Sequence, residues 1–477
     1  MLVLQQRDYS IAFLQRHIKD LAYLKLNCLH LHLSDDAGFG MESSSHPEIN
    51  SASPEYYSKT EIADLIERAS AYHVMIVPEI DVPSHSAAIL WAHPELALSK
   101  DFEGRLDLSN PATYTLVADL LNEYLPLFPG PFWHTGTDEY LYESDYMSFP
   151  QLMAYARQLY GPAANGQDVY IGFANWVDSI VKAHGKQLRA WNDVYGVEGI
   201  TQSPNPDIVL EMWWPYILPQ DALARGHSII NTESFTLYYV LGAGANDPAN
   251  PVNLYENWAP YKQWVSGVSA GGVPSFIDLP ASTPGILGGK LEVWGDPPIW
   301  ETEDQVQAGI APDLRAVSQN TWGSPRLTPA FNAFVDIMDA TGHTPDWGPD
   351  FALMASSTSA SAQAGQTAAL PLQVAAISGF NQPVALICAP VTARTTCSVS
   401  PALVTPVAGA SAPMVTLSIE TAPGAAASPE PAGQPAASRI HSVLVTASAG
   451  SLTHTMSMSV TVGAPQPVRP GPLVLLR

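Results

Sequence analysis

The first part of the chain alternates strand-like and helix-like segments about eight times over roughly 345 residues. Such an alternation predicts a parallel sheet covered by helices, and eight units fit a (β/α)8 barrel. The alternative is an open doubly wound sheet, but no Gly-rich phosphate loop follows the first strand, which weakens that interpretation. The predicted strands cover residues 2–6, 28–33, 74–80, 131–136, 187–193, 208–214, 228–232 and 289–295.

Two of the intervening segments carry clear helix signals. Ser10 is a suitable N-cap for a segment whose apolar residues recur at helical spacing as far as Leu21. The run from Ser58 to Glu61 has the form of a capping box, and the apolar positions after it extend to Ala69. Each segment is therefore expected to be an amphipathic helix with one face on the sheet.

The composition changes abruptly near residue 350. All 12 Trp and all 19 Tyr precede that point, and Lys and Asp are absent from residue 351 onward. The segment 370–463 contains short apolar runs separated by turn residues, which predicts an all-β, immunoglobulin-like sandwich. We therefore expect four parts: the barrel at 1–350, a flexible Ala/Ser/Gln-rich linker at 351–369, the sandwich at 370–463 and a Pro-rich tail at 464–477.

The cysteines are few, and their spacing is informative. Three cysteines exclude a disulfide scaffold and a Cys-rich zinc site, and we expect no metal or cofactor. Cys388 and Cys397 fall on what are expected to be neighbouring strands. They would be disulfide-bonded in an exported protein and buried thiols in a cytosolic one, and we favour the disulfide. Cys28 is expected to be a buried apolar residue.

The charge balance excludes some classes of partner. The chain has 45 acidic and 21 basic residues, a formal excess of 24 negative charges, so we expect no nucleic-acid partner. No apolar stretch is long enough for a transmembrane helix. The first residues, MLVLQQRDYS, lack the basic start and long apolar run of a signal peptide.

Polar and aromatic residues gather where the predicted strands end. In a (β/α)8 barrel these carboxyl ends form one rim, where active sites lie. Carboxylates and tryptophans on one rim are typical of a sugar site, since aromatic faces stack on sugar C–H surfaces and carboxylates do acid–base work. The strand-end residues include Arg7, Asp35, Asp36, Asp81, His85, His134, Asp138, Glu139, Trp191, Asp193, Trp213, Tyr238, Tyr239, Trp294 and Asp296.

The adjacent pair Asp138 and Glu139 is the most informative motif. Most retaining glycosidases use two carboxylates on opposite sides of the bond, about 5 Å apart. Directly adjacent carboxylates suit a substrate-assisted route, in which the substrate's own 2-acetamido oxygen attacks the anomeric carbon and forms an oxazolinium ion. One carboxylate then orients the acetamido N–H, and its neighbour protonates the leaving oxygen and later deprotonates water.

Three separated motifs resemble glycoside hydrolase family 20, the β-N-acetylhexosaminidases. The segments KLNCLHLHLSDDAGFGMES (25–43), VPEIDVPSHSAA (77–88) and WHTGTDEY (133–140) are similar to the family's second-strand, third-strand and catalytic motifs, in family order. The resemblance covers about residues 2–320. It implies an exo-acting glycosidase that removes terminal β-linked N-acetylhexosamine from glycans or glycoconjugates.

The resemblance also implies roles for individual residues. Asp138 would orient the acetamido group, Glu139 would be the general acid/base, and Tyr238 would bind the acetamido carbonyl, with Tyr239 as the alternative in case of a one-residue shift. Arg7 and Asp296 would bind sugar hydroxyls, and Tyr142 would lie near the leaving group. The remaining implied residues are the pocket walls Trp191, Trp213 and Trp294 and the supporting pair Asp35 and His85.

The family also implies an extracellular or periplasmic location. Members often carry an α/β domain ahead of the barrel, whereas the first predicted strand begins directly after Met1, so we expect that domain to be missing here. Three alternatives stay open: a disaccharide-releasing, lacto-N-biosidase-like enzyme, a non-catalytic carbohydrate-binding protein, and a metal hydrolase using His30 and His32.

Overall fold

The computed structural model contains all 477 residues and divides into two compact units. It describes residues 1–4, 9–100, 102–242, 247–295, 301–342, 344, 350–355, 359–377, 380–390, 395–407, 411–422, 439–450 and 452–463. The first unit comprises Met1–Leu241 and Pro248–Phe334, and the second contains the chain from Val335 onward.

The first unit is a closed parallel barrel, as predicted. Its strands pair in the order β1, β2, β5, β8, β9, β10, β11. Residues 286–294 close the ring, because β15 pairs with β11 and β16 pairs with β1, both in parallel. The barrel strands are β1 (Leu2–Val3), β2 (Cys28–His32), β5 (Met75–Glu79), β8 (Phe132–His134), β9 (Gln187–Trp191), β10 (Val209–Met212), β11 (Ile229–Asn231), β15 (Ile286–Gly289) and β16 (Glu292–Trp294), with β12 (Tyr238–Val240) pairing to β16.

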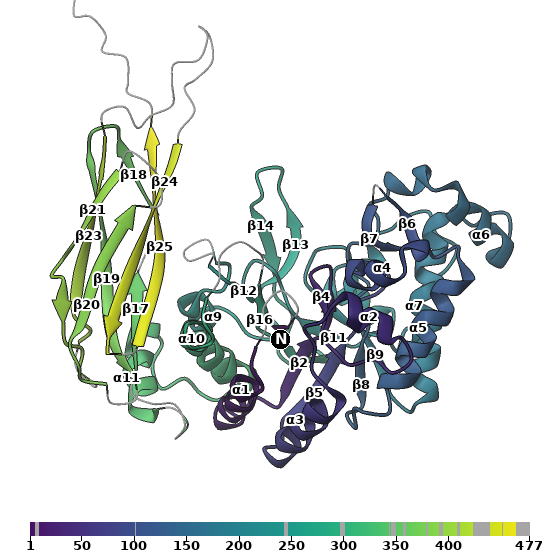
Figure 1. Ribbon diagram of the computed structural model, residues 1–477, viewed down its shortest axis with the longest axis horizontal. Coiled ribbons are helices and arrows are strands. Elements are labelled where there is room, and N and C mark those ends of the chain that lie inside the picture. Colours follow the sequence, from purple (N-terminus) through teal and green to yellow (C-terminus); the bar gives the residue numbers. More distant parts are fainter. Residues whose placement is uncertain are drawn as a thin grey trace, which may run out of the picture. The chain divides into compact units, whose positions relative to one another are not determined.

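Helices surround these strands, and α3 and α7 pack on β5 and β9 (Figure 1). The connection between β9 and β10 is an exception, since it holds one 3-10 turn and no α-helix. The helices of this unit are α1 (Ile11–Tyr23), α2 (Pro47–Ala52), α3 (Lys59–Ala71), α4 (Ala87–Ala92), α5 (Pro111–Tyr124), α6 (Pro150–Tyr160), α7 (Gly166–Ala183), α8 (Pro219–Ala224), α9 (Pro251–Glu256) and α10 (Glu303–Thr321), with 3-10 turns η1 (Pro94–Leu96), η2 (Asp145–Ser148) and η3 (Asn192–Tyr195). The last helix, α11 (Phe331–Thr341), begins in the first unit and ends in the second.

Both predicted helix starts are confirmed. The Ser10 side chain accepts a hydrogen bond from the Phe13 N–H at the start of α1. Ser58 and Glu61 form a reciprocal capping box at the start of α3. Such caps satisfy N–H groups that have no partner within the helix, and each contributes about 1 kcal/mol to stability.

Three two-stranded antiparallel sheets lie in the connections between the barrel strands. The pair β3–β4 follows β2, the pair β6–β7 follows β5, and the hairpin β13–β14 precedes β15. Their bounds are β3 (Ser34–Asp35), β4 (Gly38–Phe39), β6 (Ala97–Ser99), β7 (Phe102–Leu106), β13 (Trp264–Val268) and β14 (Pro274–Ile277).

The second unit contains a β-sandwich. One sheet has the strand order β17-β19-β23-β21, and the other has the order β18-β25-β24-β20-β22. The disulfide that the sequence favoured, between Cys388 and Cys397, joins β20 to β21. The immunoglobulin-like topology stays a prediction. The strands are β17 (Asp350–Ala355), β18 (Ser359–Gln363), β19 (Thr367–Ile377), β20 (Val384–Pro390), β21 (Thr395–Ser400), β22 (Leu403–Val404), β23 (Met414–Thr421), β24 (Arg439–Ala449) and β25 (Leu452–Gly463).

The prediction of a flexible linker at 351–369 is wrong, because β17, β18 and the start of β19 fall within it. The sandwich therefore begins near residue 350 rather than 370. In β18, Ala360 and Ala362 pack against the apolar core while Ser361 is exposed, which is the alternation of a strand. Because alanine and serine differ little in hydrophobicity, this alternation was too weak to detect in the sequence. The predicted Pro-rich tail, 464–477, lies outside the described residues.

Two further expectations concern single features. Cys28 is half-buried rather than fully buried. Among the helices within the described ranges, none combines the length and apolar character needed to cross a bilayer.

Candidate active site

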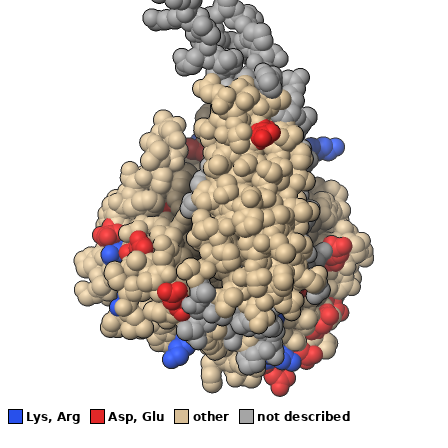
Figure 2. Space-filling view, turned by 90° about the vertical axis from the view of Figure 1, so that its left-hand side faces the viewer, with Lys and Arg blue, Asp and Glu red and all other residues tan. Residues whose placement is uncertain are grey.

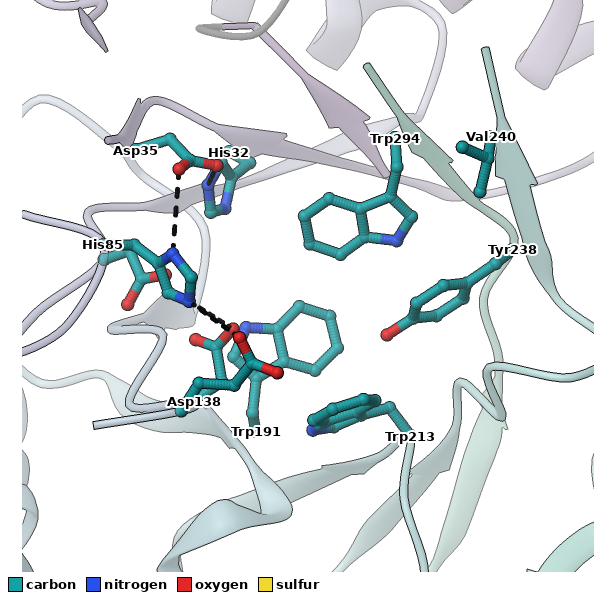
Figure 3. Close-up of a pocket in the computed structure, with 11 residues that line it drawn as sticks. His32, Asp35, His85, Asp138, Trp191, Trp213, Tyr238, Val240 and Trp294 are labelled. Atoms are coloured by element: carbon teal, nitrogen blue, oxygen red, sulfur yellow. Dashed lines mark hydrogen bonds and ion pairs between the residues drawn. The ribbon is translucent and has the colours of Figure 1, made fainter. Parts of the chain in front are cut away.

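A pocket of about 230 Å³ lies at the carboxyl ends of the barrel strands. Figure 3 shows its wall, with carboxylates and His85 on one side and aromatic rings on the other. Eight predicted site residues come together here: Asp35, His85, Asp138, Glu139, Trp191, Trp213, Tyr238 and Trp294. Among the described residues, His32, Asp81 and Val240 also line the pocket.

Three other residues were predicted to belong to the site, and only Tyr142 among them lies within the described residues. Tyr142 is 70% exposed and does not line the pocket, so the structure does not place it in the site. Arg7 and Asp296 lie outside the described residues, and their predicted contacts with sugar hydroxyls stay predictions.

The loop after β8 holds the two catalytic candidates in a strained backbone. Thr137 and Glu139 have φ angles of 75° and 49°, in the left-handed region that side chains with a Cβ seldom adopt. A Cβ on Gly136 would lie 1.8 Å from an Asp81 carboxylate oxygen, so only glycine fits there. Such strain persists only when the surroundings hold it in place, and it is characteristic of functional sites.

Hydrogen bonds with four other segments of the barrel unit fix this loop. The Glu139 N–H donates to Asp193 Oδ1 at 3.0 Å, and Arg105 Nη2 donates to the Glu139 carbonyl at 3.1 Å. The Tyr170 hydroxyl donates to the Thr137 carbonyl, and the Ser84 hydroxyl donates to the Asp138 carbonyl. The loop is therefore anchored from both sides of the catalytic pair.

His85 bridges the two groups of carboxylates. Its Nε2 lies 3.5 Å from Asp138 Oδ2 and 3.6 Å from Glu139 Oε2, while its Nδ1 lies 3.8 Å from Asp35 Oδ1 (Figure 3). Burial opposes a charge on this ring, but the neighbouring carboxylates outweigh burial and raise the pKa of His85 well above its usual range. The same contact lowers the pKa of Glu139.

The catalytic pair occupies two different environments. The side chain of Glu139 is 40% exposed, whereas that of Asp138 is 14% exposed. Burial raises the pKa of Asp138 despite the nearby His85. Burial and the Asp138 carboxylate also raise the pKa of Asp81 well above normal, which favours a protonated Asp81 beside an ionised Asp138.

Aromatic side chains form the opposite wall. The rings of Trp191 and Trp294 lie 6.2 Å apart between centroids, and the ring of Tyr238 lies 5.5 Å from that of Trp294. Figure 3 shows the Tyr238 hydroxyl pointing into the pocket. Tyr239, the alternative to Tyr238, instead donates a hydrogen bond to Glu301 and packs against Gly309. Strand alternation in β12 thus selects Tyr238, and it also explains why Val240 lines the pocket.

Asp193 was predicted to lie on the rim, but the sequence indicated no role for it. It is buried, and its two oxygens accept hydrogen bonds from the Glu139 N–H and from Trp213 Nε1, at 3.0 and 2.6 Å. Burial raises the pKa of Asp193 to about 8, which these two donors oppose. One carboxyl group thereby connects the catalytic loop to an aromatic wall.

A buried polar network lies beneath the pocket. Glu79 Oε1 accepts from Trp191 Nε1 at 3.0 Å and lies 2.8 Å from His134 Nδ1, while Glu79 Oε2 lies 2.6 Å from His32 Nδ1. His32 also contacts Asp35 Oδ2 through Nε2, at 3.1 Å. The network therefore supports both the Trp191 wall and the acidic side of the pocket, and it gives His32 a place in the site.

Three buried residues beneath the pocket, His30, Glu79 and His134, lie close enough together to hold a metal ion. However, Lys290 Nζ lies 2.8 Å from His30 Nδ1 and forms an ion pair with the buried Glu211. The lysine thus supplies positive charge in this part of the barrel. His30 and His32 point to the same buried Glu79 rather than to an open position at the rim, which disfavours the metal-hydrolase alternative.

Comparison with known proteins agrees with this geometry. Residues 5–325 match the catalytic domain of glycosyl hydrolase family 20. Lacto-N-biosidase from Bifidobacterium bifidum is 29% identical over 348 residues, which cover 72% of this chain and 30% of that protein. Beta-hexosaminidase subunit A1 from Dictyostelium discoideum is 28% identical over 291 residues, covering 58% of this chain and 50% of that protein. The chain thus spans half or less of the length of these relatives.

Solved structures show the same fold. An exo-β-N-acetylglucosaminidase from Vibrio harveyi superposes with a TM-score of 0.57 at 22% identity, covering 70% of this chain and 55% of that one. A chitobiase from Flavobacterium johnsoniae gives a TM-score of 0.55 at 24% identity, covering 69% and 48%. With the family match extending over residues 5–325, more than half of its length, the chain belongs to glycosyl hydrolase family 20.

Proposed function

We propose that this glycoside hydrolase removes terminal β-linked N-acetylhexosamine from glycans by a retaining, substrate-assisted mechanism. The single observation that carries the proposal is the composition of the pocket. Asp138 lies on one side of it and the Tyr238 hydroxyl faces this side, within walls of tryptophan, and Glu139 contacts the same His85 nitrogen as Asp138. A carboxylate and a hydroxyl that converge on an apolar pocket suit an acetamido group, which has one N–H, one carbonyl and one methyl.

In the first step the acetamido oxygen attacks the anomeric carbon, and the bond to the leaving oxygen breaks. The Asp138 carboxylate accepts a hydrogen bond from the acetamido N–H and offsets the positive charge of the oxazolinium. The Tyr238 hydroxyl donates a hydrogen bond to the acetamido oxygen. Glu139 gives its proton to the leaving oxygen. In the second step Glu139 takes a proton from water, which opens the oxazolinium and regenerates the acetamido group with retained configuration.

The protonation states can be reconciled with these roles. Glu139 must carry a proton at the start, yet His85 lowers its pKa in the free protein. Its carboxyl is 40% exposed, and a bound sugar would cover it. Removing that carboxyl from water disfavours the charged form and raises its pKa toward the value a general acid needs.

Export to an extracellular or periplasmic location is part of the proposal. It is supported by the Cys388–Cys397 disulfide, since disulfides persist mainly in oxidising compartments.

A second candidate is release of a disaccharide. The specific observation in its favour is the 29% identity to a lacto-N-biosidase over 72% of this chain. Both candidates require an N-acetylhexosamine in the pocket, and they differ in whether O3 of that sugar carries a further sugar.

The test compares three nitrophenyl glycosides: the β-N-acetylglucosaminide, the β-glucoside and the β-lacto-N-bioside. The proposal expects nitrophenol from the first and none from the second, because the glucoside lacks the acetamido nucleophile. Release from the lacto-N-bioside alone would establish the disaccharide-releasing alternative. If none of the three were cleaved while the purified protein bound the free sugars, the catalytic proposal would be wrong.

A further inference from the structure

Two histidines and a glutamate converge at a second place in the barrel unit. His46 precedes α2, Glu48 lies in its first turn, and His93 follows α4, which packs against α2. His46 Nδ1 and His93 Nε2 both lie 3.0 Å from the same atom, Glu48 Oε1. None of these residues lines the pocket described above.

The other nitrogen of each ring also faces a carboxylate. His46 Nε2 lies 3.4 Å from Asp119 Oδ2 in α5, and His93 Nδ1 lies 3.3 Å from Glu95 Oε1 in η1. An outer carboxylate on the second ring nitrogen is the arrangement that orients histidine ligands of metal ions and fixes their tautomer. The two rings stand nearly perpendicular, at 84°, with centroids 5.5 Å apart.

Counting protons shows what this cluster lacks. Two neutral imidazoles carry two N–H groups, but four ring nitrogens face carboxylate oxygens. His46 Nδ1 shares a hydrogen bond with Glu48 Oε1, whereas the buried Nε2 atoms of His46 and His93 make none, although each faces a carboxylate oxygen. Protonation of both rings would supply the missing donors at low pH, and a metal ion beside Glu48 Oε1 would supply the missing positive charge where the rings are neutral.

We propose that His46, His93 and Glu48 bind a divalent transition-metal ion, with Asp119 and Glu95 as outer carboxylates. Two imidazoles and a carboxylate are the donor set that Zn²⁺ takes in three-ligand protein sites, with water in the fourth position. Tetrahedral zinc with ligands at about 2.0–2.1 Å needs about 3.3 Å between ligand atoms, which is close to the 3.0 Å that separates each histidine nitrogen from Glu48 Oε1.

The protein offers the groups needed for such a site on its surface. The histidine side chains are 16% exposed, and that of Glu48 is 45% exposed, which leaves a path for the ion and for a water ligand. The ion would join α2, the segment after α4 and, through Asp119, α5. The site is separate from the proposed hydrolysis, so it predicts metal-dependent stability without a catalytic role.

The test is calorimetric titration of Zn²⁺ into the metal-stripped full-length protein at pH 8, where unperturbed histidines are neutral. We expect one ion per chain. His46→Gln and His93→Gln should abolish that binding, and Asp119→Asn should weaken it by about 10- to 100-fold, as outer carboxylates do elsewhere. The matched control is His73→Asn, which replaces an exposed histidine at a positive φ angle that asparagine tolerates.

Thermal unfolding supplies a second measurement. Zn²⁺ should raise the Tm of the unaltered protein and of His73→Asn, and should leave the Tm of His46→Gln unchanged. The proposal would be overturned if no ion bound, or if His46→Gln and His93→Gln bound as the unaltered protein does. It would equally be overturned if His85→Gln alone abolished binding, since the ion would then occupy the catalytic pocket.

Discussion

The barrel and the sandwich bury different kinds of side chain. Glu79, Asp81, Glu211 and Glu292 are all fully buried in the barrel. The sandwich core consists mainly of valine, leucine and alanine, with Phe351 fully buried among them. The surface differs as well, because the face of the sandwich in Figure 2 presents hardly any charged side chains.

The difference between the two cores shows that the barrel in particular contains groups whose burial lowers stability. A buried carboxylate loses its hydration and must be compensated by cations or hydrogen-bond donors. Glu211 shows this compensation, because Lys290 and Arg189 outweigh its burial and hold its pKa well below normal. Alternating apolar residues need no such compensation, so the sandwich has the composition of a structural module and the barrel that of a reactive one.

Replacement of Glu139 by glutamine should give the largest loss in the barrel. The amide cannot give a proton to the leaving oxygen, and general acid–base catalysis contributes about 10²–10⁴-fold. We expect kcat on a natural glycan to fall by at least that factor, with unchanged thermal unfolding. Steady-state kinetics measure the change, and near-normal turnover would remove Glu139 from the mechanism.

The next largest effect should come from Asp193→Asn. Asparagine has one acceptor oxygen and cannot accept from both the Glu139 N–H and Trp213 Nε1. Leaving a buried donor without its partner costs about 1–3 kcal/mol, so kcat should fall by about 5- to 100-fold. If kcat were unchanged and only the Tm fell, Asp193 would support the fold and not the position of Glu139.

His85→Gln should move the pH dependence. The imidazolium lowers the pKa of Glu139, so a neutral glutamine should let that pKa rise. Because Glu139 acts in its protonated form, the alkaline limb of the kcat profile should move to higher pH, together with a lower maximum. The profile measured across pH 4–10 shows the shift, and a limb displaced to lower pH would contradict the assigned contact.

Leu417→Ala should have the smallest effect on activity. This fully buried side chain belongs to the sandwich core, and its truncation should lower the free energy of unfolding of that unit by about 2–5 kcal/mol. Urea unfolding measures the loss, and kcat/KM below the transition should be unaffected. A parallel loss of activity in the folded protein would mean that the sandwich contributes to catalysis.

The barrel was predictable from the sequence because its signals are local and strong. The apolar strands have polar residues directly after them, and this pattern located Asp138, Glu139 and Trp294 on one rim. The choice between Tyr238 and Tyr239 depends on the register of β12, because a shift of one residue would turn Tyr239 toward the pocket in place of Tyr238.

Other parts depended on contacts distant in the sequence. The role of Asp193 comes from hydrogen bonds to residues 54 and 20 positions away, which no local pattern indicates. The strand β18 was missed because alanine and serine alternate in it with little contrast in hydrophobicity. The cluster around His46 and His93 likewise becomes visible only when α2 and α4 pack together.

The most direct test of the substrate-assisted mechanism varies the nucleophile. Fluorine atoms added one at a time to the acetamido methyl of a nitrophenyl β-N-acetylglucosaminide withdraw electrons from the carbonyl oxygen and leave the leaving group unchanged. If that oxygen attacks the anomeric carbon opposite Glu139, kcat should fall steeply with each fluorine. A kcat independent of fluorination would contradict the mechanism and show that another group forms the first bond.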